Sequence, residues 1–208
     1  MLVAVVGVLE PRRVPGGDPM NRGGTRVGAL VLLVAFIAAP ACGGGGSDPG
    51  MGGSPGPVSA GFIPDQPTPG ANTVAMLQGT QSNDVVTVSV TLTDTSGAFG
   101  TALEVVFDDA RATYLGYATG AAFEQGGNVP NYTVDGTTNP GRIVIAVART
   151  NGTAATIVGS KAILSLQFRV KQAGTNPVTI QNGVVYDAHS PPLPIPGISW
   201  YAGGLQGV

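Results

Sequence analysis

The stretch KAILSLQFRVK, residues 161–171, decides the fold class of this chain. Its apolar and polar residues alternate, and this period of two is the pattern of a β-strand with one buried face. The row expected to face inward is Ala162, Leu164, Leu166, Phe168 and Val170, and the outward row is Lys161, Ser165, Gln167, Arg169 and Lys171, with Ile163 as the one apolar exception. A single strand cannot cover its apolar row or pair its own edges, so the chain must supply more strands and a second layer.

Further strands are predicted along most of the chain after residue 72. The clearest covers residues 85–92, where Val and Leu alternate with Thr and Ser. The others cover residues 73–77, 101–107, 112–117, 132–134, 142–149, 178–186 and 198–205. The prolines from Pro191 to Pro196 predict an extended connection, because Pro cannot donate a hydrogen bond within a sheet.

These segments predict an all-β fold, an antiparallel jelly-roll-like β-sandwich of about nine strands that forms a monomeric domain over residues 72–208. Two packed sheets are favoured over one open sheet, because residues 142–149 carry two apolar rows, Ile143, Ile145 and Val147 on one face and Val144, Ala146 and Ala148 on the other. The composition agrees, since 33 Gly, 17 Pro and only 11% charged residues are typical of turn-rich β-structure. The net charge of -2 excludes a search for nucleic acid driven by charge.

The first 41 residues are typical of a targeting segment. Residues 1–19 are expected to precede the true start of translation, which we place at Met20. Residues 20–41 then have the pattern of a secretory signal peptide, with Arg22 and Arg26 before the apolar residues 27–38. The alternative is a transmembrane helix, but the apolar run is shorter than the roughly 20 residues that a span needs.

The residues at the end of this signal indicate an anchor. Ala39, Pro40, Ala41 and Cys42 resemble the lipobox of bacterial lipoproteins, which implies cleavage before Cys42 and acylation of its thiol. Cys42 is the only cysteine, so it has no disulfide partner within the chain. Several acyl chains on one residue give stable membrane anchoring, so the resemblance implies a location in the bacterial cell envelope, at the outer membrane or cell surface.

Residues 42–71 are predicted to be the lipid attachment site followed by a disordered Gly/Pro-rich tether. Phe62 and Ile63 form its only sizeable apolar pair, and we expect them to be solvated rather than docked on the domain. The tether would hold the folded domain away from the lipid head groups.

The core pattern of residues 72–208 resembles the cohesin domain. The resemblance rests on residues 85–92, on the segment from Leu103 to Asp108, on Tyr114-Leu115, and on Gly159 before residues 162–170. The family usually has Tyr-Asp-Pro where this chain has Phe107-Asp108-Asp109. The resemblance implies a β-sandwich that binds a calcium-loaded dockerin module through one sheet face, but it identifies no contact residue in this chain.

The sequence does not predict an enzyme. His189 is the only histidine, and although Asp187 and Ser190 flank it, neighbours along an extended chain do not form a catalytic constellation by themselves. Asp108, Asp109 and Asp135 lack the spacing of a calcium loop, so we predict neither a metal nor a cofactor.

Two kinds of ligand remain open. A protein partner, dockerin-like and bound through a flat sheet face, is favoured by the cohesin resemblance. A polysaccharide is the alternative, and its candidate ligand-binding residues are Tyr132, Trp200 and Tyr201, of which the last two should face opposite ways on a strand. An aromatic content of 6% disfavours a stacked sugar platform. A structural envelope lipoprotein is the third possibility.

Overall fold

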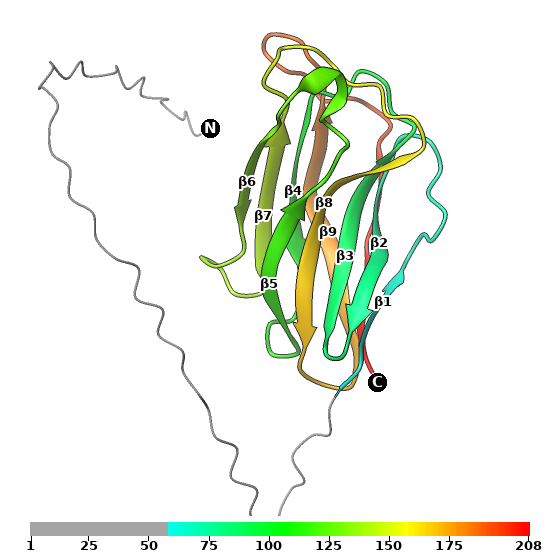
Figure 1. Cartoon of the computed structure of the whole chain (residues 1–208), viewed down its shortest axis with the longest axis vertical. Coiled ribbons are helices and arrows are strands. Elements are labelled where there is room, and N and C mark those ends of the chain that lie inside the picture. The colour runs from blue at the N-terminus through cyan, green and yellow to red at the C-terminus, as the bar shows by residue number, and fades with distance from the viewer. Residues whose placement is uncertain (1–57) are drawn as a thin grey trace, which may run out of the picture. The chain divides into compact units, whose positions relative to one another are not determined.

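The computed structural model describes residues 58–208, which form a sandwich of two β-sheets (Figure 1). The six-stranded sheet has the order β1 (Ala60–Pro64), β11 (Gly203–Gly207), β9 (Gly174–Tyr186), β4 (Gly100–Val106), β7 (Arg142–Ala148) and β6 (Asn131–Asp135). The five-stranded sheet has the order β10 (Ser199–Tyr201), β2 (Thr73–Ser82), β3 (Val85–Thr93), β8 (Ser160–Val170) and β5 (Ala112–Thr119). A short 3₁₀ helix, η1 (Gln125–Gly127), lies in the loop between β5 and β6.

The core fills the space between the inner faces of the two sheets. Val86, Val88 and Val90 of β3 are fully buried, as are Leu164, Leu166 and Phe168 of β8. From the other sheet, Phe107 meets Phe168 edge to face with ring centroids 5.2 Å apart, a favourable aromatic geometry. The predicted all-β sandwich is therefore confirmed.

All nine predicted segments contain strands, but the last one is divided. Residues 198–205 contribute β10 to one sheet and β11 to the other, and the chain changes sheets at the buried Ala202. In addition, β10 runs parallel to β2, so the sandwich is not purely antiparallel. A Cβ at Gly203 would lie 2.3 Å from the Ile63 carbonyl oxygen, so only Gly can occupy this crossing.

The prediction of a solvated linker as far as residue 71 is wrong for β1. Ala60–Pro64 pairs antiparallel with β11 and forms the edge of the six-stranded sheet. Phe62 is only 2% exposed, whereas Ile63 points outward and is 59% exposed. Burial of the Phe62 ring supplies the free energy that the surrounding Gly and Pro residues lack. The rest of residues 42–71 that lies before residue 58 is outside the described part of the chain.

The inward row predicted for residues 161–171 needs one correction. The register of β8 against β3 shifts between Ala162 and Leu164 because a β-bulge lies there. The bulge turns both Ile163 and Leu164 into the core, while Ala162 is only partly buried. Ile163 is therefore a core residue, and the row from Leu164 to Val170 faces inward as predicted.

The predicted upstream segment 1–19, the signal peptide 20–41 and the acylated Cys42 all lie outside the described residues. Among residues 58–208, no helix is long and apolar enough to cross a membrane.

Candidate functional site

The outward side chains of β9, β4, β7 and β6 form one surface, which we call the hollow face. The strand register places Gly100 of β4 between Tyr186 of β9 and Ala148 of β7, with Asn131 of β6 next in the same row. The next row along the strands is Val184, Ala102, Ala146 and Thr133, and the one after it is Gln181, Glu104, Val144 and Asp135. The upper two rows contain no charged residue.

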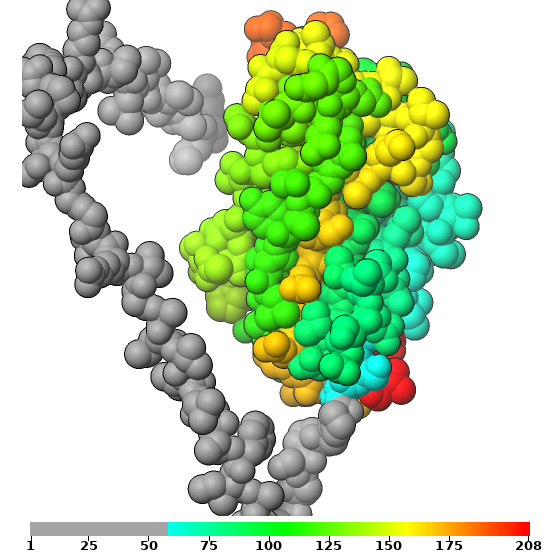
Figure 2. Space-filling model, in the orientation of Figure 1, coloured from blue at the N-terminus to red at the C-terminus, as the bar shows by residue number. Residues whose placement is uncertain are grey.

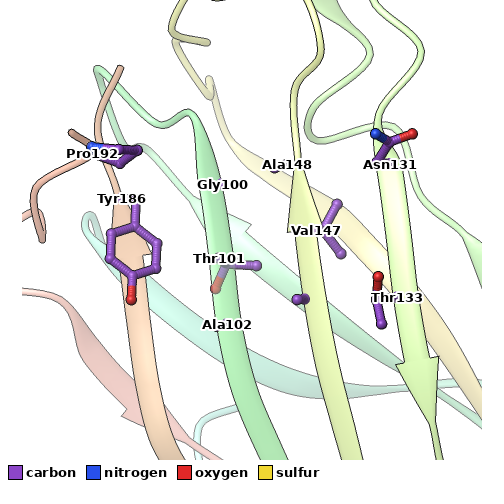
Figure 3. A pocket seen from close by; sticks show the side chains of 10 residues that line it. Gly100, Thr101, Ala102, Asn131, Thr133, Val147, Ala148, Tyr186 and Pro192 are labelled. Atoms are coloured by element: carbon purple, nitrogen blue, oxygen red, sulfur yellow. The ribbon is translucent and has the colours of Figure 1, made fainter. Parts of the chain in front are cut away.

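The floor of the hollow is made of small residues on two neighbouring strands. It is lined by Gly100, Thr101 and Ala102 of β4 and by Ala146, Val147 and Ala148 of β7 (Figure 3). A Cβ at Gly100 would lie 2.7 Å from the Val147 carbonyl oxygen, so the close approach of the two strands requires Gly. Thr101 and Val147 are buried and face inward, so no side chain larger than a methyl group rises from this floor. The sheet surface is therefore sunken here.

Larger side chains stand on both sides of the floor. Figure 3 shows Tyr186 and Pro192 on one side, and Asn131 and Thr133 of β6 on the other. The open space between them has a volume of about 410 Å³. Concave sites of 300 to 1,000 Å³ lined mainly by apolar groups are typical of ligand-binding surfaces.

Asp187 holds the proline-rich loop that supplies Pro192. Its Oδ1 accepts hydrogen bonds from the backbone N–H groups of Leu193, at 2.9 Å, and His189, at 3.1 Å. These bonds, the one from Leu193 first, hold the pKa of the Asp187 carboxyl below its usual range, because they favour the charged form. The loop is tied to β9 as well, since the Ile195 N–H donates to the Val185 carbonyl at 2.8 Å. The wall that contains Pro192 is therefore fixed by hydrogen bonds to Asp187 and to β9.

The charged residues of the hollow face lie beyond the hollow. Arg142 Nη1 contacts Glu104 Oε2 at 2.5 Å, so these two charges neutralise each other. Asp135 accepts hydrogen bonds from Thr138 and Thr137 in the turn after β6, and these bonds lower the pKa of its carboxyl from 3.8 to about 2. Both groups of charges are already satisfied within the molecule.

The opposite face, formed by the outward side chains of β2, β3, β8 and β5, has a different character. Figure 2 views the molecule from this side, with β5, β8 and β3 next to one another. Hydroxyl groups on β3 and β8 pair with each other, as in Ser89 with Ser165 at 3.0 Å and Thr93 with Ser160 at 2.8 Å, while Leu115 and Tyr117 of β5 are exposed. A hollow of about 260 Å³ lies over the bulge of β5 and has a mixed polar and apolar lining.

Tyr132 lies apart from the other two candidate residues for sugar binding. It is on β6, and its phenol donates to the carbonyl oxygens of Gly120, at 2.8 Å, and Ile163, at 3.2 Å. Its ring packs 6.3 Å from that of Tyr117 on the facing strand β5. Burial raises the pKa of the Tyr132 phenol. The side chain therefore joins the two sheets at the β5/β6 edge.

Trp200 and Tyr201 lie on β10, at the other edge of the sandwich from β5. Trp200 packs against the core, and a Cβ at Gly183 of β9 would lie 2.7 Å from its indole. Tyr201 is 39% exposed, so the two side chains face opposite ways, as predicted. The structure does not bring Tyr132, Trp200 and Tyr201 together into one platform.

The remaining candidate residues serve the loops. His189 Nδ1 contacts Asp187 Oδ2 at 2.5 Å, but the imidazole is 71% exposed and the pair is part of the proline-rich loop. Asp108 Oδ1 accepts from the Ala110 N–H and closes a turn after β4. Within residues 58–208, no group of three His, Cys, Asp or Glu side chains is placed to hold a metal ion.

Comparison with known proteins identifies the family. The sequence model of the cohesin domain matches residues 72–190, which is more than half of the chain. The chain therefore belongs to the cohesin family. No match is found among curated proteins.

Solved cohesin structures share the fold. A type II cohesin domain from the cellulosome of Acetivibrio cellulolyticus is 16% identical with a TM-score of 0.51, and the match covers 72% of this chain and 95% of that one. A mutant type II cohesin–X-dockerin complex from Acetivibrio cellulolyticus matches at 9% identity and a TM-score of 0.51, covering 72% of this chain and 98% of that one. A non-cellulosomal cohesin from the archaeon Archaeoglobus fulgidus is 16% identical with a TM-score of 0.44, covering 69% and 88%. At these identities the likeness to the two type II cohesin structures establishes the fold alone.

The hollow face was not identified from the sequence, although its signal was present. Val144, Ala146 and Ala148 were assigned to a second buried row, but Val144 is 39% exposed and Ala146 also faces solvent. Small apolar residues that alternate with a buried Ile and Val row are consistent with either a second core or a docking surface. Only the register of the four strands shows which one they form.

Proposed function

We propose that this chain is a non-catalytic binding module that captures a dockerin-like protein partner on the hollow face. The observation that carries the proposal is an exposed sheet face with small apolar side chains and no charge over two rows, on a fold of the cohesin family. Protein interfaces exclude charged residues from their centre and keep them at the rim, which is how Glu104, Arg142 and Asp135 are arranged here.

A calorimetric titration tests this function. The full chain is titrated with recombinant dockerin modules encoded by the same organism, once with calcium and once with a chelator. We expect saturable 1:1 binding with calcium and its loss in chelator, because the calcium belongs to the dockerin fold. The polysaccharide alternative replaces this one if none of the modules binds and cellulose or xylan in the gel slows the migration of the protein. In that case Trp200→Ala or Tyr201→Ala should restore normal migration.

We also propose that the module acts at a membrane surface. The support is the resemblance of residues 39–42 to a lipobox after the apolar residues 27–38. Acylated Cys42 would anchor the protein in the bacterial cell envelope, and the residues before β1 would join the anchor to the sandwich. Mass spectrometry of the native protein should find diacylglycerol on an N-terminal Cys42. An intact segment 27–41 on the native protein would contradict the anchor and leave the proposed binding function untouched.

A further inference from the structure

The hollow combines a low floor with two walls of different chemistry. Its floor is Gly and Ala on the outer rows of β4 and β7, and its walls rise from β9 with its following loop and from β6. Three strand spacings of about 4.8 Å separate the backbones of Tyr186 and Asn131, so roughly 14 Å lies between the bases of the two walls. The side chains of the two walls occupy part of this width, and a single flat group of the partner can lie on the floor between them.

We propose that the hollow receives one aromatic side chain with a hydrogen-bonding group, a tyrosine or tryptophan of the partner protein. This inference rests on the proposed function and specifies which residue type of the partner the hollow face selects. The occupant is set by the two walls together, as the following contacts show.

The first wall favours an aromatic ring. Tyr186 and Pro192 present a ring and a pyrrolidine side by side, and the floor offers only methyl groups and backbone. An aromatic side chain buries about 150 to 250 Å², more than an aliphatic one can cover. A ring lying on Ala102 and Ala146 would fill the sunken area, whereas a short side chain would leave it partly empty.

The second wall favours a polar group on that ring. Asn131 and Thr133 are exposed, and neither side chain makes a hydrogen bond within residues 58–208. A purely apolar ligand would cover these groups without pairing them, and a buried unpaired donor or acceptor is unfavourable. A tyrosine hydroxyl or an indole N–H can pair with them. A charged side chain is excluded, because the hollow contains no opposite charge and Glu104 is already paired with Arg142.

The proline-rich loop makes the first wall a positioning element. Pro192 lies between His189 and Leu193, whose N–H groups are both held by Asp187. Asp187 is therefore a positioning residue, since it lies outside the hollow and acts through Pro192. Asp187→Ala should weaken binding of an aromatic group, and Asp187→Asn should restore part of it because the amide oxygen still accepts hydrogen bonds.

An NMR titration of the full chain tests the inference with small probes. The probes are N-acetyl-tyrosinamide, N-acetyl-phenylalaninamide and N-acetyl-lysinamide. We expect saturable shifts of the Ala102, Ala146 and Ala148 amides with the first two, about fivefold tighter binding of the tyrosine probe because of one added hydrogen bond, and no binding of the lysine probe. Asn131→Ala combined with Thr133→Ala should lower the affinity of the tyrosine probe to that of the phenylalanine probe.

A matched pair of variants completes the test. Ala146→Leu fills the hollow and should abolish the shifts, whereas Ala118→Leu on β5 of the opposite face should leave them unchanged. Equal binding of all three probes, or binding that persists in Ala146→Leu, would overturn the inference. If a dockerin binds to the hollow face but no aromatic probe does, the inference of an aromatic partner residue is wrong and the proposed function stands. If the aromatic probes bind as expected and no dockerin does, the proposed function is wrong and the hollow still selects an aromatic group.

Discussion

The hollow face and the opposite face of the sandwich are built from the same strand alternation, yet they differ in how many of their outward side chains are hydrogen-bonded to one another. On the opposite face the hydroxyls pair with one another, as Ser89 does with Ser165 at 3.0 Å. On the hollow face Ala102, Ala146 and Val144 have no hydrogen-bonding side chain. The polar side chains of the wall, Asn131 and Thr133, make no hydrogen bond within the described residues. A partner on the opposite face would cover hydroxyls of β3 and β8 that are already paired and therefore offer it few free hydrogen-bonding groups, whereas a partner on the hollow face removes small apolar side chains from water. The difference explains why the two faces of one sandwich can have different roles.

The largest difference in stability is expected between substitutions at two neighbouring residues of β8, one in the core and one on the opposite face. Phe168 is fully buried and contacts Phe107, whereas Gln167 points outward. Phe168→Ala should lower the free energy of unfolding by about 3 to 5 kcal/mol, the usual cost of truncating a buried aromatic residue, and Gln167→Ala by much less. Chemical denaturation of both variants measures this. Equal losses would mean that the facing of β8 is assigned wrongly.

Replacing two arginines in turn compares the stability contribution of a buried loop contact with that of a surface ion pair. Arg149 is 5% exposed and its guanidinium donates to the carbonyls of Phe123 at 2.8 Å, Gln125 at 2.7 Å and Thr153 at 2.7 Å. Arg149→Met should lower the free energy of unfolding by about 2 to 4 kcal/mol, because these carbonyls lose their donors. Arg169→Met removes only an exposed pair with Asp84 and should cost less than about 1 kcal/mol. Thermal unfolding would contradict the comparison if the two variants had the same midpoint.

Asp135, at the end of the hollow face, should produce a small pH dependence. Its pKa is lowered on folding from 3.8 to about 2, so its contribution to stability is fully present above pH 4 and is lost as the pH falls toward 2. The Asp135→Asn variant should lack the part of the acid sensitivity that falls in this window. NMR titration of the carboxyl carbon gives the folded pKa directly, and a midpoint near 3.8 would exclude the Thr138 and Thr137 contacts as its cause.

The sequence was sufficient for the sandwich because alternation is local. The pattern of residues 161–171 predicted a strand with Phe168 and Leu166 inside, and both are fully buried. It was not sufficient for Ile163, because a β-bulge depends on the register with β3 rather than on neighbouring residues. It also missed β1, because Phe62 finds its pairing partner in β11 at the far end of the chain.

The site was less accessible to sequence reasoning than the fold. Tyr132, Trp200 and Tyr201 were selected as aromatic residues, but a residue type does not show whether its ring is packed, and Tyr132 and Trp200 contact the core. The hollow depends on Gly100, Ala102 and Ala146, which are unremarkable in sequence. They form a floor only because β4 and β7 are neighbours in the register Gly100↔Ala148 and Ala102↔Ala146.

The central claim, that the partner binds to the hollow face and not to the opposite face, is tested most directly by placing the same charge on each. Ala146→Arg puts a guanidinium at the middle of the hollow face, and Ser165→Arg puts one at the middle of the opposite face. The affinity of the full chain for a calcium-loaded dockerin, measured by calorimetry, should fall at least about a hundredfold in the first variant, because a buried unpaired charge is strongly unfavourable, and should change less than about threefold in the second. A large loss in Ser165→Arg with Ala146→Arg unaffected would contradict the account.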